Sequence, residues 1–246
     1  MRLALSAMAL LPALCLAADT PPKLRLNEVE KVTPVGYRAD LTLDPQKDDF
    51  TGTVSIRLDV KEATSIIWLN QESITIQSAL LKSGSRTAAA TVVPGGDDFV
   101  GFKFERQVPT GRAELTIAYK GVVFNKNSAG LFRQQDLGNW YLFSQFEPTD
   151  ARGAFPCFDE PSYKTPWQLT LRVPAADTAV SNTGIVSDKT EGAMRVVTFR
   201  ETLPLPSYLV ALAVGPIRLV GGQPVERHID RHKPVLLVMG SAQLLQ

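Results

Sequence analysis

Hydrophobic and polar positions alternate along most of this chain. The runs 54–61, 114–120 and 168–173 each place an apolar side chain at every second position, and the side chains between them are polar except Ala118. A period of two puts one face of a strand in a core and the other in water. Half-buried strands of this kind are typical of antiparallel sheets.

Turn residues separate these runs at short intervals. The clearest turns are Pro94–Asp98, Pro109–Gly111 and Glu191–Gly192. Short strands divided by turns about every ten residues predict an all-β fold, an antiparallel β-sandwich. No segment shows a long apolar stripe at helical spacing. The best helical segment is a short turn over Asp150–Phe155, which Pro156 ends.

The first residues predict an export signal. Arg2 supplies a positive start, residues 3–14 form a short apolar run, and Cys15 and Ala17 are small residues at the −3 and −1 positions of a cleavage site. We therefore expect a signal peptide over 1–17 and an exported protein, periplasmic or secreted. The alternative is an uncleaved membrane anchor, although the run is short for a bilayer span. No later stretch is apolar enough to cross a membrane.

The rest of the chain divides at a glycine-rich segment. Gly221–Pro224 predicts a boundary, so we expect a β-sandwich domain over 18–222 and the truncated start of a following domain over 223–246. The second piece is too short to bury a core of its own. Loss of Cys15 with the leader would leave Cys157 without a disulfide partner, so the domain depends on its core.

Composition excludes one class of partner. The 246 residues carry 26 basic and 25 acidic side chains, with 44% hydrophobic residues, and no basic block stands out. This is an ordinary globular balance. Nucleic-acid binding would need a clustered positive face, so no nucleic-acid partner is expected.

The most distinctive stretch runs from Phe143 to Pro161 and reads FSQFEPTDARGAFPCFDEP. It resembles the N-terminal domain signature of the aminopeptidase N family of zinc metallopeptidases, which also includes leukotriene-processing hydrolases. Two further matches follow in order, Ala179–Asn182 and Thr202–Gly215. The resemblance extends over about 37–215, which makes it far more specific than a short glycine motif. It implies a saddle-like N-terminal β-domain.

The resemblance also implies roles for two residues. Gln145 would line the pocket for the first substrate side chain, and Glu147 would bind the free α-amino group of a peptide. A partly buried carboxylate recognises an ammonium through a charge-assisted hydrogen bond. It also rejects blocked peptides, which cannot supply the charge. Without the resemblance, Glu147 would be interpreted as a solvated loop carboxylate.

Other polar residues of the stretch are interpreted as structural. Asp150 could pair with Arg152 across the helical turn or cap it. Asp159 and Glu160 are adjacent carboxylates, but neighbours in extended chain point opposite ways, which argues against acid–base catalysis. Cys157 has no evident histidine partner and is expected to be a buried, inert thiol.

The zinc-binding residues of the family are missing from the sequence. Its enzymes hold zinc on a His-Glu-x-x-His helix with a further glutamate and use a Gly-x-Met-Glu-Asn strand, and neither motif occurs here. His228 and His232 have the spacing of two zinc ligands, but Ile229 stands where the catalytic glutamate would be. Pro234 follows two residues after His232 and disfavours the long helix on which such ligands would lie. We therefore expect two surface histidines and no metal site.

Together these observations predict the N-terminal domain of an exported zinc aminopeptidase. This domain would contribute to recognition of the substrate amine. Its partners would be the N-terminus of a peptide substrate and the missing catalytic domain. The chain alone would be inactive. The zinc of the whole enzyme would polarise the scissile carbonyl and activate a water. Two alternatives stay open, a non-catalytic exported β-sandwich that binds peptides or proteins and a catalytically dead relative that serves as a scaffold.

Overall fold

The period-two runs form strands with one buried face. The computed structural model describes residues 20–22, 25–26, 31–125, 127–219 and 235–236. In β2 (Asp49–Val60), every second residue from Val54 to Val60 is buried while the intervening ones are partly exposed. The same alternation occurs in β8 (Gly111–Val122) and β11 (Trp167–Pro174). The half-buried strands predicted from the sequence are therefore confirmed.

The largest sheet has eight strands in the order β13-β14-β11-β1-β2-β8-β4-β5. Neighbours pair antiparallel except β1 and β11, which run parallel. The strands not yet given bounds are β1 (Val32–Thr42), β4 (Thr75–Ser83), β5 (Arg86–Ala89), β13 (Ile185–Glu191) and β14 (Met194–Phe199).

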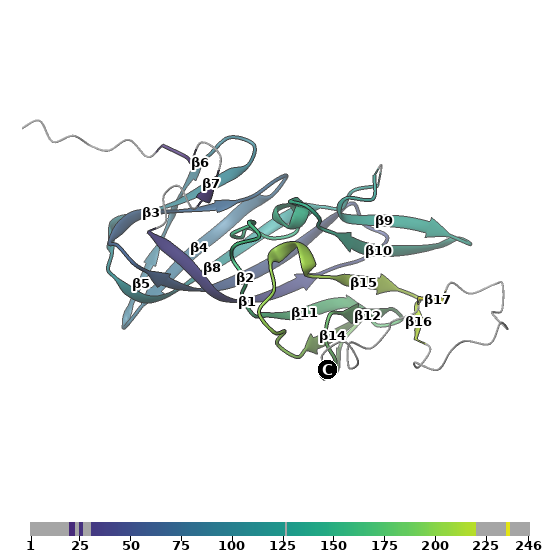
Figure 1. The fold of residues 1–246 in the computed structure, drawn as a ribbon. Helices are drawn as coiled ribbons and strands as arrows, with labels where there is room; N and C mark the ends of the chain where they lie inside the picture. The colour runs from purple at the N-terminus through teal and green to yellow at the C-terminus, as the bar shows by residue number, and fades with distance from the viewer. Residues whose placement is uncertain (1–19, 23–24, 27–30, 126, 220–234, 237–246) are drawn as a thin grey trace, which may run out of the picture.

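Three smaller sheets accompany the large one. A three-stranded sheet has the order β3-β7-β6, a four-stranded sheet has the order β12-β15-β10-β9, and β16 pairs parallel with β17. Figure 1 shows the three-stranded sheet at one end of the molecule and the hairpin of β9 and β10 toward the other. Their strands are β3 (Thr64–Asn70), β6 (Thr91–Pro94), β7 (Phe99–Val108), β9 (Gly130–Asp136), β10 (Asn139–Gln145), β12 (Thr178–Ser181), β15 (Leu212–Gly215), β16 (Arg218–Leu219) and β17 (Val235–Leu236).

One hydrophobic core joins the large sheet to the three-stranded and four-stranded sheets. Its buried side chains include Ile56 of the large sheet, Phe102 of the three-stranded sheet and Leu142 of the four-stranded sheet. The rings of Tyr37 and Trp167, on the parallel strands β1 and β11, stack with centroids 3.8 Å apart. Sheets packed face to face over a shared core confirm the predicted all-β sandwich.

The helical segments are short. The described residues contain no α-helix, and η2 (Asp150–Gly153) and η3 (Ser207–Leu209) are 3-10 turns. The predicted helical turn before Pro156 is thus confirmed as η2. No helix in the described part of the chain is long and apolar enough to cross a membrane.

Three predictions fall outside the described residues. They are the signal peptide over 1–17, the boundary between 222 and 223, and the surface histidines His228 and His232. All three stay predictions.

Candidate functional site

The site begins where β10 ends. Gln145 is the last residue of β10 and pairs with Gly130, the first residue of β9. Gly130 has a φ of +68°, and a Cβ there would lie 3.0 Å from the ring of Phe124. Glycine therefore suits both the backbone conformation and the space at this pairing. The hairpin of β9 and β10 places Gln145 at the end of an inner strand of the four-stranded sheet.

Phe146 anchors the segment that follows. Its side chain is almost fully buried and packs edge to face on Phe155, with ring centroids 5.6 Å apart. Its carbonyl oxygen accepts a hydrogen bond from the backbone N–H of Asp150 at 2.9 Å, where η2 begins. The buried ring and this hydrogen bond hold the backbone on both sides of Phe146 in place.

Gln145 and Glu147 flank this anchor, and both are exposed. Among the described residues, neither side chain has a hydrogen-bond or ion-pair partner. The structure therefore brings the two sequence-predicted residues to one stretch of surface, with polar groups available to a ligand. The peptide bond between Glu147 and Pro148, in the same stretch, is cis.

The other two stretches of the family resemblance lie beside this segment. The hydroxyl of Ser144 accepts a hydrogen bond from the N–H of Leu212 at 2.8 Å. The side-chain amide of Asn182 donates to the carbonyl of Leu209 and accepts from the N–H of Ala211. Residues around 145, 182 and 202–215, far apart in sequence, thus form one continuous region.

This region also exposes large apolar side chains. Leu209 is 49% exposed and Leu203 is 70% exposed. Both belong to the segment that leads into β15, the strand paired with β10. Exposed apolar groups next to polar groups without partners are typical of a surface that another part of a protein covers.

A buried ion pair stabilises η2, immediately after the exposed segment. The Nε of Arg152 donates to Oδ2 of Asp159 at 3.1 Å, and its terminal nitrogen donates to Asp98 at 2.8 Å. The hydroxyl of Ser207 donates to the other oxygen of Asp159. Burial lowers the pKa of Arg152, but the hydrogen bonds and charges of Asp159 and Asp98 raise it above its ordinary value overall. Arg152 is therefore a fixed cation that joins η2 to its neighbours.

The expected pairing of Asp150 with Arg152, or capping by Asp150, is wrong. Arg152 is engaged by Asp98 and Asp159 instead, and the residue at the N-cap of η2 is Thr149, with no side-chain cap. Asp150 is the first residue of the turn, and burial raises the pKa of its carboxyl, with Asp159 adding to the effect and Arg152 opposing it. The guanidinium of Arg152 instead binds Asp159, seven residues away, and Asp98, 54 residues away.

Asp159 and Glu160 diverge as the sequence predicts. Asp159 is buried against Arg152 and Ser207, and its N–H donates to the side-chain carbonyl of Asn70 at 3.0 Å. Glu160 accepts a hydrogen bond from the backbone N–H of Leu26. The structural interpretation of both carboxylates is confirmed. Sequence reasoning missed Asn70 and Asp98, for which no local pattern exists, and Ser207, which lies inside the third matched stretch.

Cys157 is a buried thiol, as expected. Its side chain has no exposed surface, and its backbone exchanges hydrogen bonds with Asn70. Burial raises the pKa of the thiol well above its ordinary value, and the nearby charge of Asp159 adds to this. A thiol that stays protonated in the core is a poor nucleophile.

The described residues provide no cluster of three or more His, Cys, Asp or Glu side chains that could hold a metal ion. Two carboxylates beside η2, Asp98 and Asp159, already pair with Arg152. A resident zinc therefore does not fit this part of the chain.

Known proteins resemble this chain over most of its length. A family profile described as the Peptidase M1 N-terminal domain matches residues 33–209. Aminopeptidase M1 of Arabidopsis thaliana is 35% identical over 193 residues, which are 74% of this chain and 22% of the relative. Aminopeptidase M1-A of Oryza sativa is 34% identical over 190 residues, 72% of this chain and 22% of the relative.

A bacterial relative matches over a larger share of its own length. Aminopeptidase N of Acetobacter pasteurianus is 30% identical over 198 residues, which are 78% of this chain and 55% of that protein. The match thus spans about a fifth of the plant relatives and about half of the bacterial one.

Proposed function

Because this chain belongs to the peptidase M1 family, of which it carries the N-terminal domain, we propose that it forms one wall of the active site of a zinc aminopeptidase. In such an enzyme Glu147 binds the free α-amino group of a peptide, and Gln145 contacts the side chain of its first residue. The observation that carries the proposal is the exposure of both side chains, without partners in the described structure, on either side of the buried Phe146.

The chemistry of Glu147 suits an ammonium. A carboxylate without an internal partner accepts charge-assisted hydrogen bonds from a cation, and these are about twice as strong as neutral ones. An acetylated or internal peptide nitrogen carries no such charge. Glu147 would therefore select substrates with a free N-terminus and place them at a fixed distance from the bond that is cut.

The metal would come from elsewhere in the enzyme. M1 enzymes are zinc peptidases, but no described residue of this chain fits a metal site. Zinc bound in a catalytic domain would act as a Lewis acid and activate a water. The exposed Leu203 and Leu209 support the presence of such a domain, because apolar side chains beside the site would be buried against it.

Export remains part of the proposal. The basic residue, apolar run and small residues within 1–17 support secretion to the periplasm or the medium. The substrates would then be peptides outside the cytoplasm.

The test uses the complete gene product that contains these 246 residues. Replacement Glu147→Gln keeps the size of the side chain and removes its charge, so kcat/KM for an alanyl reporter with a free amine should fall about a hundredfold. Glu105→Gln is the matched control, because Glu105 is an exposed carboxylate on β7, in a different sheet. It should leave kcat/KM unchanged.

Two results would contradict the proposal. One is equal kcat/KM for Glu147→Gln and the parent enzyme. The other is a gene with a stop codon directly after Gln246 and no Gly-x-Met-Glu-Asn or His-Glu-x-x-His sequence nearby, which would favour the non-catalytic binding module.

A further inference from the structure

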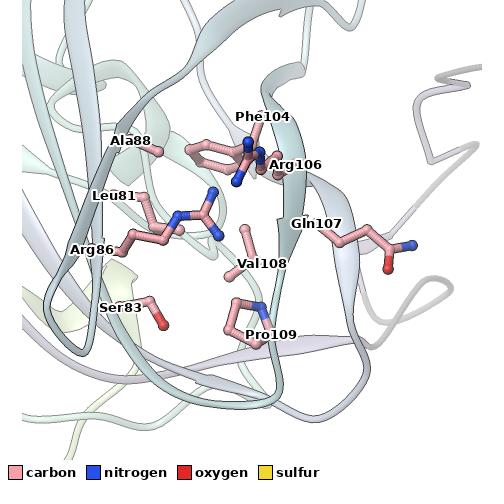
Figure 2. Close-up of a pocket in the computed structure, with 9 residues that line it drawn as sticks. All are labelled: Leu81, Ser83, Arg86, Ala88, Phe104, Arg106, Gln107, Val108 and Pro109. Atoms are coloured by element: carbon pink, nitrogen blue, oxygen red, sulfur yellow. The ribbon is translucent and has the colours of Figure 1, made fainter.

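The end of the sandwich at the β4–β5 hairpin holds a small pocket distinct from the proposed substrate site. It lies between the edge of the eight-stranded sheet and β7 of the three-stranded sheet (Figure 2). Its floor is apolar and its rim carries two arginines. We call it the arginine pocket and define it by Leu81, Arg86, Ala88, Phe104, Arg106 and Val108.

Both arginines are exposed, and each lies on the strand face that is turned toward the pocket. Along β7, the side chains of Phe102 and Phe104 are buried, and Arg106 is the next residue on the same face. On β5, Arg86 shares a face with Ala88, which pairs with buried Leu81 across the hairpin. Figure 2 shows the guanidinium of Arg86 directed over Leu81 toward Phe104, whereas Gln107 points away. Two exposed cations therefore continue, at the rim of the pocket, strand faces whose neighbouring side chains are apolar.

Neither guanidinium is neutralised. Among the described residues, Arg86 and Arg106 make no ion pair or hydrogen bond, and no acidic residue lines the pocket. Glu105 precedes Arg106 on β7 and so lies on the opposite face of the strand. Other arginines of the sheets do have partners, including Arg38 with Glu114 and Arg195 with Asp188. Two unpaired like charges at one pocket create a local field that favours an anion.

The apolar floor limits what kind of anion fits. The pocket has a volume of about 40 Å³. This is room for about three groups the size of a water molecule or a methyl group. A short branched or straight hydrocarbon chain could fill this space against Phe104 and Val108, with its charged end at the rim. A bare inorganic anion would leave the floor uncovered.

We propose that the arginine pocket binds a carboxylate carried on a short apolar chain. Arginine presents two parallel N–H groups that match the geometry of a carboxylate, and two such side chains can hold one carboxylate from both sides. Two kinds of ligand carry such a carboxylate, a free short-chain acid and the C-terminus of a peptide that ends in an apolar residue. The proposal is independent of the role of Glu147.

A purely structural role predicts a different behaviour. Charges beside an edge strand such as β5 prevent association with another sheet, and arginine stems can cover apolar surface. In that role, the pocket takes no ligand, and removal of the charges promotes association of the chain.

The test is a titration of the 246-residue chain followed by NMR of the arginine Nε–H groups. The probes are isovalerate and N-acetyl-Gly-Leu, which share an isobutyl group and a carboxylate, and N-acetyl-Gly-Leu-amide, which lacks the charge. We expect saturable shifts of the Arg86 and Arg106 signals with a carboxylate probe and none with the amide. Tighter binding of isovalerate identifies a free acid as the source, and tighter binding of the peptide identifies a C-terminus.

Variants separate binding from folding. Arg86→Gln and Arg106→Gln should each weaken binding of the better probe about tenfold, the loss of one charge-assisted hydrogen bond. Lys82→Gln is the control, because Lys82 is an exposed cation on β4 beside Leu81. It should change the affinity less than twofold. If one arginine variant does not fold, the other serves alone.

Any of three outcomes would overturn the proposal. The first is the absence of saturable shifts with both carboxylate probes. The second is equal affinity for the peptide and its amide. The third is an affinity that Arg86→Gln and Arg106→Gln leave unchanged.

Discussion

The Nε of Arg152 lies 3.1 Å from Oδ2 of Asp159, with the two side chains only 12% and 1% exposed. This pair lies at the base of the exposed segment that carries Gln145 and Glu147. The pair links η2, which begins three residues after Glu147, to the segment before β11. Ser207, which donates to Asp159, extends this link to η3. The position of Glu147 on the surface thus depends on an interaction inside the protein.

Replacement Asp159→Asn should reduce the unfolding free energy by about 3 kcal/mol. The change leaves the buried guanidinium of Arg152 without its main counter-charge, and loss of one partner of a buried pair is strongly destabilising. Urea unfolding followed by tryptophan fluorescence measures the effect.

The control for that experiment is Asp98→Asn, which removes the other partner of Arg152. Asp98 is 65% exposed, so its pair is screened by water and should contribute less than about 1 kcal/mol. Equal losses in the two variants would contradict the assigned importance of the buried partner.

Replacement Tyr119→Phe should reduce the unfolding free energy by about 1–2 kcal/mol. The buried hydroxyl donates to the carbonyl oxygen of Ala154 at 2.9 Å, and its removal leaves that carbonyl without its partner. A urea midpoint equal to that of the parent chain at pH 7 would show that this hydrogen bond adds nothing.

Buried tyrosines also predict a loss of stability in alkali. Burial raises the pKa of Tyr37 and Tyr119 well above the ordinary value of 10.0, and burial likewise raises the pKa of Cys157 above 9.0. The unfolded chain then releases these protons first, so the stability is complete below pH 9 and falls as pH rises through 9 and 10. Urea unfolding between pH 7 and 11 should show this fall, with a smaller slope in Tyr119→Phe. A flat profile would contradict it.

Replacement Phe146→Ala should act on both stability and the site. The almost fully buried ring packs on Phe155, so its loss should cost about 3–5 kcal/mol. In the complete enzyme it should also raise KM for a reporter with a free amine, because the backbone of Glu147 loses its anchor. Leu80→Ala on exposed surface of β4 is the control and should change neither quantity. Unchanged KM in a folded Phe146→Ala enzyme would argue against the anchoring role.

Replacement Gln145→Ala should change substrate preference in the complete enzyme without removing its need for a free amine. If Gln145 contacts the first side chain, kcat/KM ratios among alanyl, leucyl and arginyl reporters should shift by about tenfold. Uniform loss across all three reporters would assign Gln145 a different role.

N-terminal sequencing of the exported protein checks the leader. Cleavage after Ala17 should give a mature chain that begins at Ala18. A chain that still begins at Met1 in the membrane fraction would support the uncleaved anchor instead.

The fold was predictable from sequence because its signals are local. Alternation in β2, β8 and β11 and the turn at Pro94–Asp98 each involve neighbouring residues, so their pattern could be recognised without a structure. The separate partners of Asp159 and Glu160 also fit the expectation that neighbouring side chains of an extended chain point opposite ways.

Long-range pairing was not predictable in the same way. The parallel contact of β1 with β11, the ion pair of Arg152 with Asp98 and the hydrogen bond of Ser207 to Asp159 join segments with no shared local pattern. The expectation that Asp150 would pair with Arg152 failed for this reason. Sequence proximity favoured one carboxylate, whereas burial placed another against the guanidinium.

The parallel pairing of β1 with β11 constrains the order in which the protein can be assembled. More than half of the 246-residue chain lies between Tyr37 and its stacking partner Trp167. While the chain emerges from the ribosome, β1 can pair with β2 on one side, but its other edge has no partner until β11 has been made. Contacts of such long sequence separation form slowly. A chain interrupted before β11 would present an open, apolar strand edge, the kind of intermediate that chaperones and proteases recognise.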